Sequence, residues 1–268
     1  MKEITIFCPT IGVGGVEKNL YLISNYLIQK NLKVNLITCN FEKRKNFKKN
    51  IKIIGPKNTN YSKSSQFLKI LICLYYFFKS NIIQRKTTLF SFQSNIYLIL
   101  VAILIGHKII TRINSSPDIY LKNPIKKLFF SKIYKFSDCV IVNSHDLKNK
   151  VKRYLKINSK VIYNPAYSGK NFNLKYKKKR ERQINLLNVG RLTYQKNQLL
   201  LLRALNEIEN INYKLILIGN GSEEKKLNEF IKLNRLQKKI KMIKNVTNIN
   251  KYLSKCDTFI LTSRYEGL

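Results

Sequence analysis

The sequence is short of acidic residues and contains no tryptophan. It has 14 aspartates and glutamates against 51 lysines and arginines, which gives a formal net charge of +37. An excess of this size attracts polyanions such as nucleic acid, anionic lipid or phosphorylated ligands. Codon bias is an equally good explanation, because the abundant residues Lys, Asn, Ile, Tyr and Phe all have A/T-rich codons. The charge alone therefore does not identify a partner.

Closely spaced cysteines are also missing. The chain has five cysteines, Cys8, Cys39, Cys73, Cys139 and Cys256, and none forms a CxxC pair or has the spacing of metal ligands. Four of them lie in or at the end of apolar strand-like runs, and Cys73 lies in a helix-like run. We therefore predict buried, apolar cysteines in a reducing compartment, and no metal site.

Two further absences concern membranes and secretion. The opening residues "MKEITIFCP" lack the apolar core and cleavage site of a signal peptide, and they predict a short strand. The most apolar runs are "FLKILICLYYFF" and "NIYLILVAILIG". A membrane-spanning helix needs about 20 apolar residues, and both runs are shorter. They are predicted to be core helices of an α/β domain.

Short apolar runs alternate with longer amphipathic ones along the whole chain. Runs such as "EITIFCP", "KVNLITC" and "CVIVNS" are apolar throughout, which is typical of parallel strands buried on both faces. Helical patterns separate them, for example from Gly15 to Lys30 and from Ser144 to Leu155. Strand–helix–strand order with right-handed crossovers predicts an α/β chain with doubly wound sheets.

The alternation breaks once, which divides the chain into two predicted doubly wound domains. Residues 166–183 follow Pro165, contain a Gly and a basic run without periodicity, and are interpreted as a linker. Residues 1–165 form the first domain, and residues 184–268 form a second domain with only four strands. The second domain is expected to be incomplete, because no helix follows to cover its last strand.

Glycines and charged residues follow several of the predicted strands. Ligands of open α/β sheets bind outside the carboxyl ends of the strands, where helix N-termini also offer N–H groups to phosphates. Tight turns and solvated cations are the alternative explanation for each cluster taken singly. The clusters are Gly14 with Gly15, Arg191 with Lys196, Gly219 with Gly221, and Glu266.

Several longer motifs together resemble one known family. The segments are "GGVEKNLYLISNYL", "IVNSHDLKNKV", "VIYNP", "VGRLTYQKNQLLLLRAL", "LIGNGSEEKKL" and "SRYEGL". In this order, and over nearly the whole chain, they resemble the family-4 glycosyltransferases of the GT-B fold. The resemblance implies two Rossmann-like domains, and transfer of a sugar from a nucleotide-sugar donor with retention of anomeric configuration. It implies no metal and no cofactor besides the donor substrate.

The resemblance also assigns roles to individual residues of the donor site. Gly14 and Gly15 match the glycine loop near the donor phosphates and the acceptor. Arg191 and Lys196 match the pair of cations that neutralises the diphosphate and stabilises the departing nucleotide. Gly219 and Gly221 match a loop near the nucleotide.

Glu266 matches the first of two glutamates in a family motif, the one that faces the donor sugar. The second, which holds the ribose, would fall beyond Leu268. The resemblance therefore implies a family member stopped inside its own signature, with little or no transferase activity as it stands. A non-catalytic remnant of such a gene is an alternative.

The segment "TRINSSPD" departs from the family. Many members have a histidine after this strand, near the reacting sugar, whereas this chain has Arg112 and Asn114 there. Arg112 is therefore predicted to be a catalytic-site residue that contacts the acceptor or the donor. His107 lies before the strand and is interpreted as structural.

These observations favour a hexosyl- or N-acetylhexosaminyl-type glycosyltransferase that builds surface polysaccharide or lipopolysaccharide on a glycan or lipid-linked acceptor. The protein is expected in the cytoplasm, with its positive charge on the anionic inner membrane leaflet. Residues 125–136, "IKKLFFSKIYKF", suit such an interface, although an ordinary helix with a basic face explains them too. A nucleic-acid-binding protein is the alternative from another class. Because only the charge supports it, no specific nucleic acid is expected.

Overall fold

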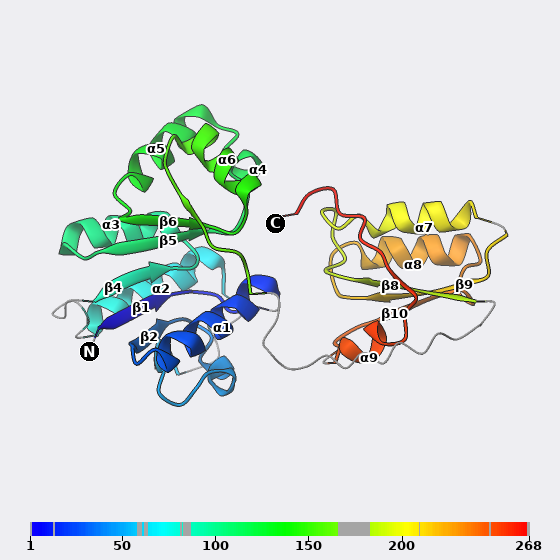
Figure 1. Ribbon diagram of the computed structural model, residues 1–268, viewed down its shortest axis with the longest axis horizontal. Coiled ribbons are helices and arrows are strands. Elements are labelled where there is room, and N and C mark those ends of the chain that lie inside the picture. Colours follow the sequence, from blue (N-terminus) through cyan, green and yellow to red (C-terminus); the bar gives the residue numbers. More distant parts are fainter. Residues whose placement is uncertain are drawn as a thin grey trace. The chain divides into compact units, whose positions relative to one another are not determined.

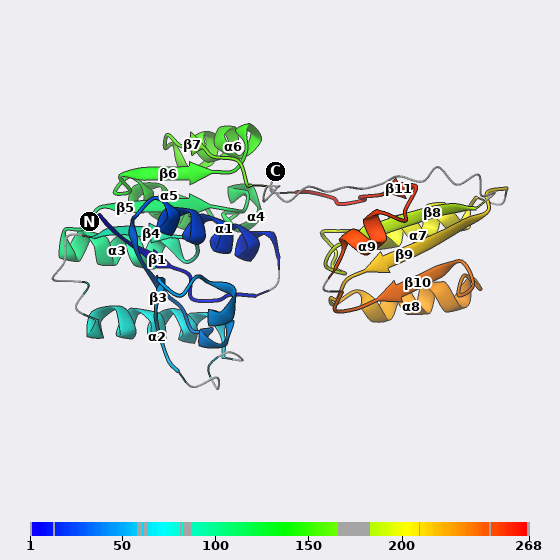
Figure 2. The same cartoon turned by 60° about the horizontal axis from the view of Figure 1, so that its bottom comes forward.

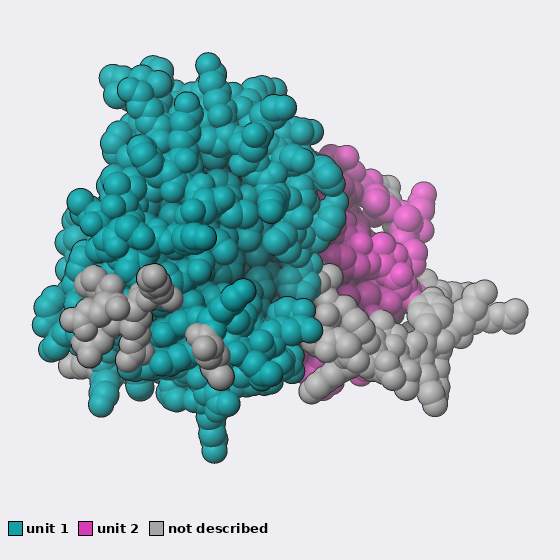
Figure 3. Space-filling view, turned by 60° about the vertical axis from the view of Figure 1, so that its left-hand side comes forward, with its two compact units in different colours: residues 1–169, 267–268 teal, residues 170–266 magenta. Residues whose placement is uncertain are grey.

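The computed structural model describes residues 2–12, 14–57, 61, 64–80, 82, 87–165, 183–208, 210–246 and 248–266. The chain divides into two compact units, unit 1 with residues 1–169 and unit 2 with residues 170–266 (Figure 3). Each unit has its own parallel sheet, so the chain is of the predicted α/β class. Residues 166–182 of the predicted linker lie outside the described residues, and the domain boundaries at 165 and 184 stay a prediction.

The sheet of unit 1 has seven described strands in the order β3-β2-β1-β4-β5-β6-β7 (Figures 1 and 2). Chain order continues outward in both directions from the neighbouring strands β1 and β4, which is the arrangement of a doubly wound sheet. The strands are β1 (Glu3–Phe7), β2 (Lys33–Ile37), β3 (Lys52–Ile54), β4 (Thr88–Ser91), β5 (Ile109–Ile113), β6 (Cys139–Val142) and β7 (Lys160–Val161). The helices are α1 (Gly15–Gln29), η1 (Phe41–Asn46), α2 (Gln66–Lys79), α3 (Asn95–Ile105), α4 (Pro117–Tyr120), α5 (Pro124–Tyr134) and α6 (His145–Leu155).

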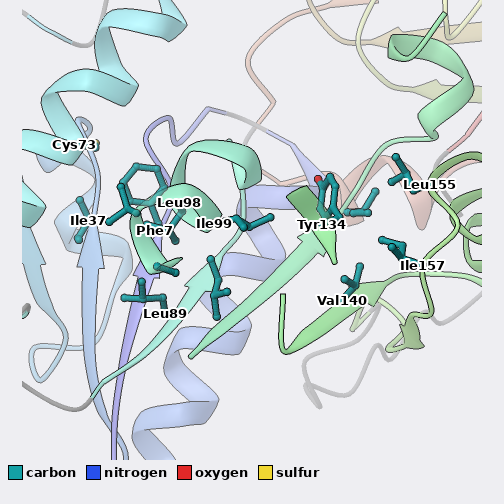
Figure 4. Packing of buried hydrophobic residues seen from close by; sticks show 14 of the residues in the cluster. Phe7, Ile37, Cys73, Leu89, Leu98, Ile99, Tyr134, Val140, Leu155 and Ile157 are labelled. Carbon is teal, nitrogen blue, oxygen red and sulfur yellow. The ribbon is translucent and has the colours of Figure 1, made fainter. Parts of the chain in front are cut away.

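Both faces of this sheet are buried, because successive side chains of a strand point to opposite faces. Phe7 and Ile37 belong to one apolar cluster with residues of α2, α3, α5 and α6 (Figure 4). Their neighbours Ile6 and Leu36 belong to a separate cluster that includes Leu20 of α1. Strands buried in this way have no polar side to expose, which explains their apolar runs.

The predicted helices of unit 1 are confirmed, with local signals at their first residues. The Ser144 side chain accepts a hydrogen bond from the backbone N–H of Leu147 and caps α6, and Ser65 caps α2 in the same way. The apolar helices α2 and α3 are only partly core helices, since Phe67 is 57% and Leu104 80% exposed. Their apolar runs surround the helix, and one sheet can cover only one side. Among the described helices, none is long and apolar enough to cross a membrane.

The sheet of unit 2 has four described strands in the order β10-β9-β8-β11. They are β8 (Ile184–Val189), β9 (Tyr213–Ile218), β10 (Ile240–Ile243) and β11 (Thr258–Phe259). Helices α7 (Gln198–Asn206) and α8 (Glu224–Leu233) lie on one side of the sheet, and the short α9 (Asn250–Leu253) lies on the other (Figure 1). The apolar run from Thr258 to Leu261 predicts a longer last strand than the structure has. Among the described strands β11 pairs with β8 alone, at the edge of the sheet, and Phe259 is 43% exposed.

The predicted burial of the cysteines is confirmed for three of the five. All five thiols are free, and Cys8, Cys39 and Cys73 are buried as predicted. Cys139 and Cys256 are only partly buried. Cys139 is the first residue of β6, and Cys256 comes just before β11, so both stand at the amino edge of their sheets.

Candidate functional site

In unit 2, the loops after β8 and β11 bring two of the predicted site residues into contact. Lys196 precedes α7, and Glu266 follows β11, 70 residues later. The Lys196 Nζ lies 2.5 Å from the Glu266 Oε1, and the two side chains are 21% and 37% exposed. Arg191 lies in the same loop, where its Nη2 donates a hydrogen bond of 3.4 Å to the Gln195 Oε1.

Hydrogen bonds between the two loops hold this pair in place. The Thr262 hydroxyl donates to the carbonyl oxygen of Lys196 at 3.2 Å, and the Gln195 side chain donates to that of Tyr265 at 3.1 Å. The backbone N–H of Arg264 donates to the carbonyl oxygen of Gln195 at 2.8 Å. The sequence analysis missed Gln195, Thr262 and Arg264. Gln195 and Arg264 lie within the two recognised motifs and Thr262 directly precedes the second, and this position was the only available signal.

The electrostatics of Glu266 follow from its neighbours. Burial raises the pKa of its carboxyl group, but the hydrogen bond from Lys196 and the charges of Lys196 and Arg191 outweigh burial, so the net pKa is below the usual range. Glu266 is therefore ionised at neutral pH. An incoming diphosphate would compete with this carboxylate for Lys196.

Gly219 and Gly221 are explained by close packing of the loop after β9 against the loop after β8. A Cβ added at Gly219 would lie 1.8 Å from the carbonyl oxygen of Gly190, and one at Gly221 would lie 2.1 Å from that of Leu192. Glycine is therefore needed here whether or not a ligand binds. The predicted contact of these two residues with the nucleotide stays a prediction.

In unit 1, the glycine loop after β1 faces the first turn of its own helix. The Glu17 carboxylate accepts a hydrogen bond of 3.4 Å from the Gly12 N–H, and a Cβ at Gly14 would lie 3.0 Å from its Oε2. Nothing lies within 4 Å of a Cβ built at Gly15. A phosphate at this N-terminus, as predicted for Gly14 and Gly15, would have to displace the Glu17 carboxylate.

Arg112, in β5, is the most unusual predicted residue, because its charge is buried among neutral groups. The side chain is 2% exposed. Its Nε donates to the Asn114 Oδ1 at 2.9 Å, its Nη2 donates to the Asn164 Oδ1, and its guanidinium carbon lies 5.5 Å from the centroid of the Phe92 ring. Burial lowers the pKa of Arg112. No carboxylate of the described residues pairs with it.

Two further predictions concern His107 and metal binding. His107 lies before β5, with its Nδ1 3.1 Å from the carbonyl oxygen of Ile105. Among the described residues, no group of three or more His, Cys, Asp and Glu side chains could hold a metal ion.

Comparisons with known proteins agree with the two-unit architecture. Residues 13–166 match the profile of Glycosyltransferase Family 4, and residues 170–268 match that of Glycosyl transferases group 1. The crystal structure of HepE from Anabaena, in complex with UDP and glucose, superposes with a TM-score of 0.74 at 17% identity, covering 100% of this chain and 76% of that one.

Two curated relatives connect the chain to glycan synthesis. One is the N-acetylgalactosamine-N,N'-diacetylbacillosaminyl-diphospho-undecaprenol 4-alpha-N-acetylgalactosaminyltransferase of Campylobacter jejuni, 26% identical over 280 residues, which are 100% of this chain and 76% of that protein. The other is the amylovoran biosynthesis glycosyltransferase AmsD of Erwinia amylovora, 37% identical over 87 residues, which are 32% of this chain and 25% of that protein.

The matched segments of curated relatives thus range from 25% to 76% of those proteins' own lengths. The Family 4 match alone spans more than half of the chain. The seven-stranded and four-stranded parallel sheets match the solved structures over the whole chain. The chain belongs to the family-4 glycosyltransferases and has the GT-B fold.

Proposed function

We propose that the activity of this protein is the transfer of a sugar from a nucleotide-sugar donor to a glycan or lipid-linked acceptor during synthesis of a surface polysaccharide, with retention of anomeric configuration. The low activity expected of the chain as it stands stays a prediction. The observation that carries this proposal is the cluster of Arg191, Lys196 and Glu266 at the carboxyl edge of the unit 2 sheet. The complex of HepE with UDP and the undecaprenol-linked substrate in the name of the Campylobacter relative support it.

The chemistry requires a group that stabilises negative charge on the leaving nucleotide. The bond between the anomeric carbon and the phosphate oxygen breaks, and the nucleoside diphosphate leaves with the electron pair. The acceptor hydroxyl oxygen then bonds to the anomeric carbon, and its proton passes to an oxygen of the departing diphosphate. Lys196 and Arg191 are the cations that would neutralise the departing diphosphate, and this stabilisation is largest as the bond breaks.

The ion pair between Lys196 and Glu266 is proposed to be the resting state of this site. A diphosphate carries more negative charge than one carboxylate, so donor binding would draw Lys196 away from Glu266. The freed carboxylate would then face the sugar, in the role that the family resemblance assigns to it. The reaction is proposed to need no metal and no further cofactor.

Donor binding by the purified chain tests the proposal. UDP, GDP and their sugars are titrated by calorimetry against the chain and the variants Arg191→Ala and Lys196→Ala. Each substitution should weaken binding of the preferred nucleotide roughly tenfold to a hundredfold, because a hydrogen bond to a charged group contributes ~1.5–3 kcal/mol. Lys214→Ala is the matched control, since Lys214 is an exposed cation on β9 of the same unit. Equal affinities in all four proteins would show that Arg191 and Lys196 are solvated surface cations and do not bind the nucleotide.

The acceptor side and the cellular location are proposed on weaker grounds. Hexosyl or N-acetylhexosaminyl transfer is suggested by the relatives' names. A location on the cytoplasmic face of a membrane is suggested by the positive charge and by α5, where Ile125 is 78% and Leu128 59% exposed beside several lysines.

A further inference from the structure

Unit 1 contains a cavity of about 710 Å³ at the carboxyl ends of β4 and β5, next to α3 and α5. All of its lining residues belong to unit 1. Its polar wall contains Arg112, Asn114, Ser94 and Lys126, and its apolar wall contains Phe92 and Phe130. A cavity with both kinds of wall fits a ligand that has a charged group and an apolar part.

The polar wall has an uncompensated positive charge. Arg112 is almost fully buried, and within the described part of the chain its side chain donates hydrogen bonds to two neutral amide oxygens. A buried charge costs free energy unless an opposite charge pairs with it. Lys126 adds a second cation at the rim. An anionic ligand would supply the missing counter-charge.

The N-terminus of α3 opens into the same wall. Its N-cap residue Ser94 has a φ of 60° and makes no side-chain capping hydrogen bond, so the helix end offers N–H groups to an anion. The Asn95 Nδ2 donates to the Arg112 carbonyl oxygen and to the Tyr134 hydroxyl, both at 2.9 Å. The buried Asn95 Oδ1 has no hydrogen-bond donor among the described residues, and it needs one such as a sugar hydroxyl.

The apolar wall continues onto the outer surface of α3 and α5. Tyr97, Leu100 and Phe129 line the cavity and are also 38%, 38% and 49% exposed. Leu104 of α3 is 80% exposed, and the ring of Phe67 on α2 lies 6.3 Å from that of Tyr97. Exposed apolar side chains that gather beside a charged pocket indicate a binding surface.

We propose that this cavity binds the phosphate or diphosphate group of a polyprenyl-linked sugar, and that the prenyl chain leaves over α3 and α5. This ligand rests on the proposed function, in which it is the acceptor. A free glycan would donate a hydrogen bond from a hydroxyl group to the Asn95 Oδ1. It would leave Arg112 without a counter-charge and the apolar surface uncovered. A lipid-linked sugar phosphate satisfies all three features with one molecule.

Direct binding without any donor tests the proposal. Farnesyl diphosphate, inorganic diphosphate and farnesol are titrated against the full chain in a neutral detergent. Farnesyl diphosphate should bind more tightly than either of the other two probes. Arg112→Gln and Lys126→Gln should each weaken its binding about tenfold or more, because each removes a charged donor to the phosphates. Leu100→Ser should weaken binding of farnesyl diphosphate but not of inorganic diphosphate.

Matched controls separate the outcomes. Arg153→Gln, at an exposed arginine of α6 outside the cavity, should bind farnesyl diphosphate as the unchanged protein does. Lys126 is exposed, so its variant still reports on the site if Arg112→Gln fails to fold. Unchanged affinity in Lys126→Gln and in a folded Arg112→Gln would overturn the proposal. Equal affinities for inorganic diphosphate and farnesyl diphosphate would also overturn it. So would displacement of farnesyl diphosphate by phosphatidylglycerol at equal concentration, because that would indicate a general lipid-binding surface. Intact UDP binding in the same samples would leave the proposed function standing.

Discussion

The two units hold their candidate site residues in different ways. In unit 1, Arg112 is part of a strand in the middle of a sheet that is buried on both faces, and it is 2% exposed. In unit 2, Lys196 and Glu266 lie in loops, are 21% and 37% exposed, and depend on hydrogen bonds between those loops. The comparison indicates that burial positions the first site, whereas reciprocal loop contacts position the second. Core substitutions in either unit should therefore have large effects, and loop substitutions in unit 2 should have small ones.

The largest expected effects come from truncating one core at a time. Phe77→Ala in unit 1 and Leu202→Ala in unit 2 each remove a fully buried side chain. The expected losses in free energy of unfolding are about 3–5 kcal/mol for Phe→Ala and about 2–5 kcal/mol for Leu→Ala. Differential scanning calorimetry should show two transitions, with each variant lowering a different one. A single transition lowered equally by both variants would show that the units unfold together.

A smaller effect is expected from the glycines of unit 2. Gly219→Ala places a Cβ 1.8 Å from a backbone oxygen, so the loop after β8 has to move. We expect a loss of about 1–3 kcal/mol in the unit 2 transition and weaker nucleotide binding. Gly15→Ala in unit 1 is the control, because its Cβ meets no atom within 4 Å and the unit 1 transition should stay in place. Normal stability of Gly219→Ala would show that the two loops are not packed as described.

Removing one loop contact should matter less. Thr262→Val keeps the shape of the side chain but removes its hydrogen bonds to the carbonyl oxygens of Lys196 and Asn197. The expected loss is about 0.5–1.5 kcal/mol, seen as weaker UDP binding in calorimetry. Thr258→Val is the comparison, because Thr258 lies on the edge strand β11, before the loop that contains Thr262. Identical affinities for the two variants would exclude a positioning role for Thr262.

The smallest effect concerns pH and the ion pair. Because the folded-state pKa of Glu266 lies below its unfolded value, its contribution to stability is present at neutral pH and is lost as the pH falls through the folded pKa. The pair is partly exposed, so the contribution should be about 0–1 kcal/mol. Urea unfolding of the chain and of Glu266→Gln should therefore differ slightly at neutral pH and converge in acid. A difference that grows in acid would contradict the assigned direction.

Much of the architecture could be predicted from sequence, for a physical reason. Parallel strands buried on both faces are apolar throughout, and amphipathic helices between them show their period, so both sheets were recognisable. The short η1 and α4 were missed, because a single turn leaves no periodic pattern. β11 was predicted too long, since the apolar residues Ile260 and Leu261 continue its pattern beyond Phe259, where the strand ends.

The site was predictable at the level of motifs but not of contacts. Arg191, Lys196 and Glu266 were recognised by resemblance, yet nothing in the sequence pairs Lys196 with a residue 70 positions away. The neutral surroundings of Arg112 were equally hidden, because Asn164 lies 52 positions later in the chain. Whether the recognised residues bind a donor stays a prediction that the titrations above address.

The pairing of β11 with β8 also sets an order of assembly. The Asp257 carboxylate accepts a hydrogen bond from the backbone N–H of Asn185, 72 residues earlier. Contacts across so long a loop form slowly, since closing the loop costs entropy before any contact compensates it. During synthesis, unit 1 is complete before β11 leaves the ribosome, because chains emerge from the N-terminus and domains fold as units. The cavity of unit 1 that contains Arg112 is thus formed early, and the contact between Lys196 and Glu266 is among the last to form during folding.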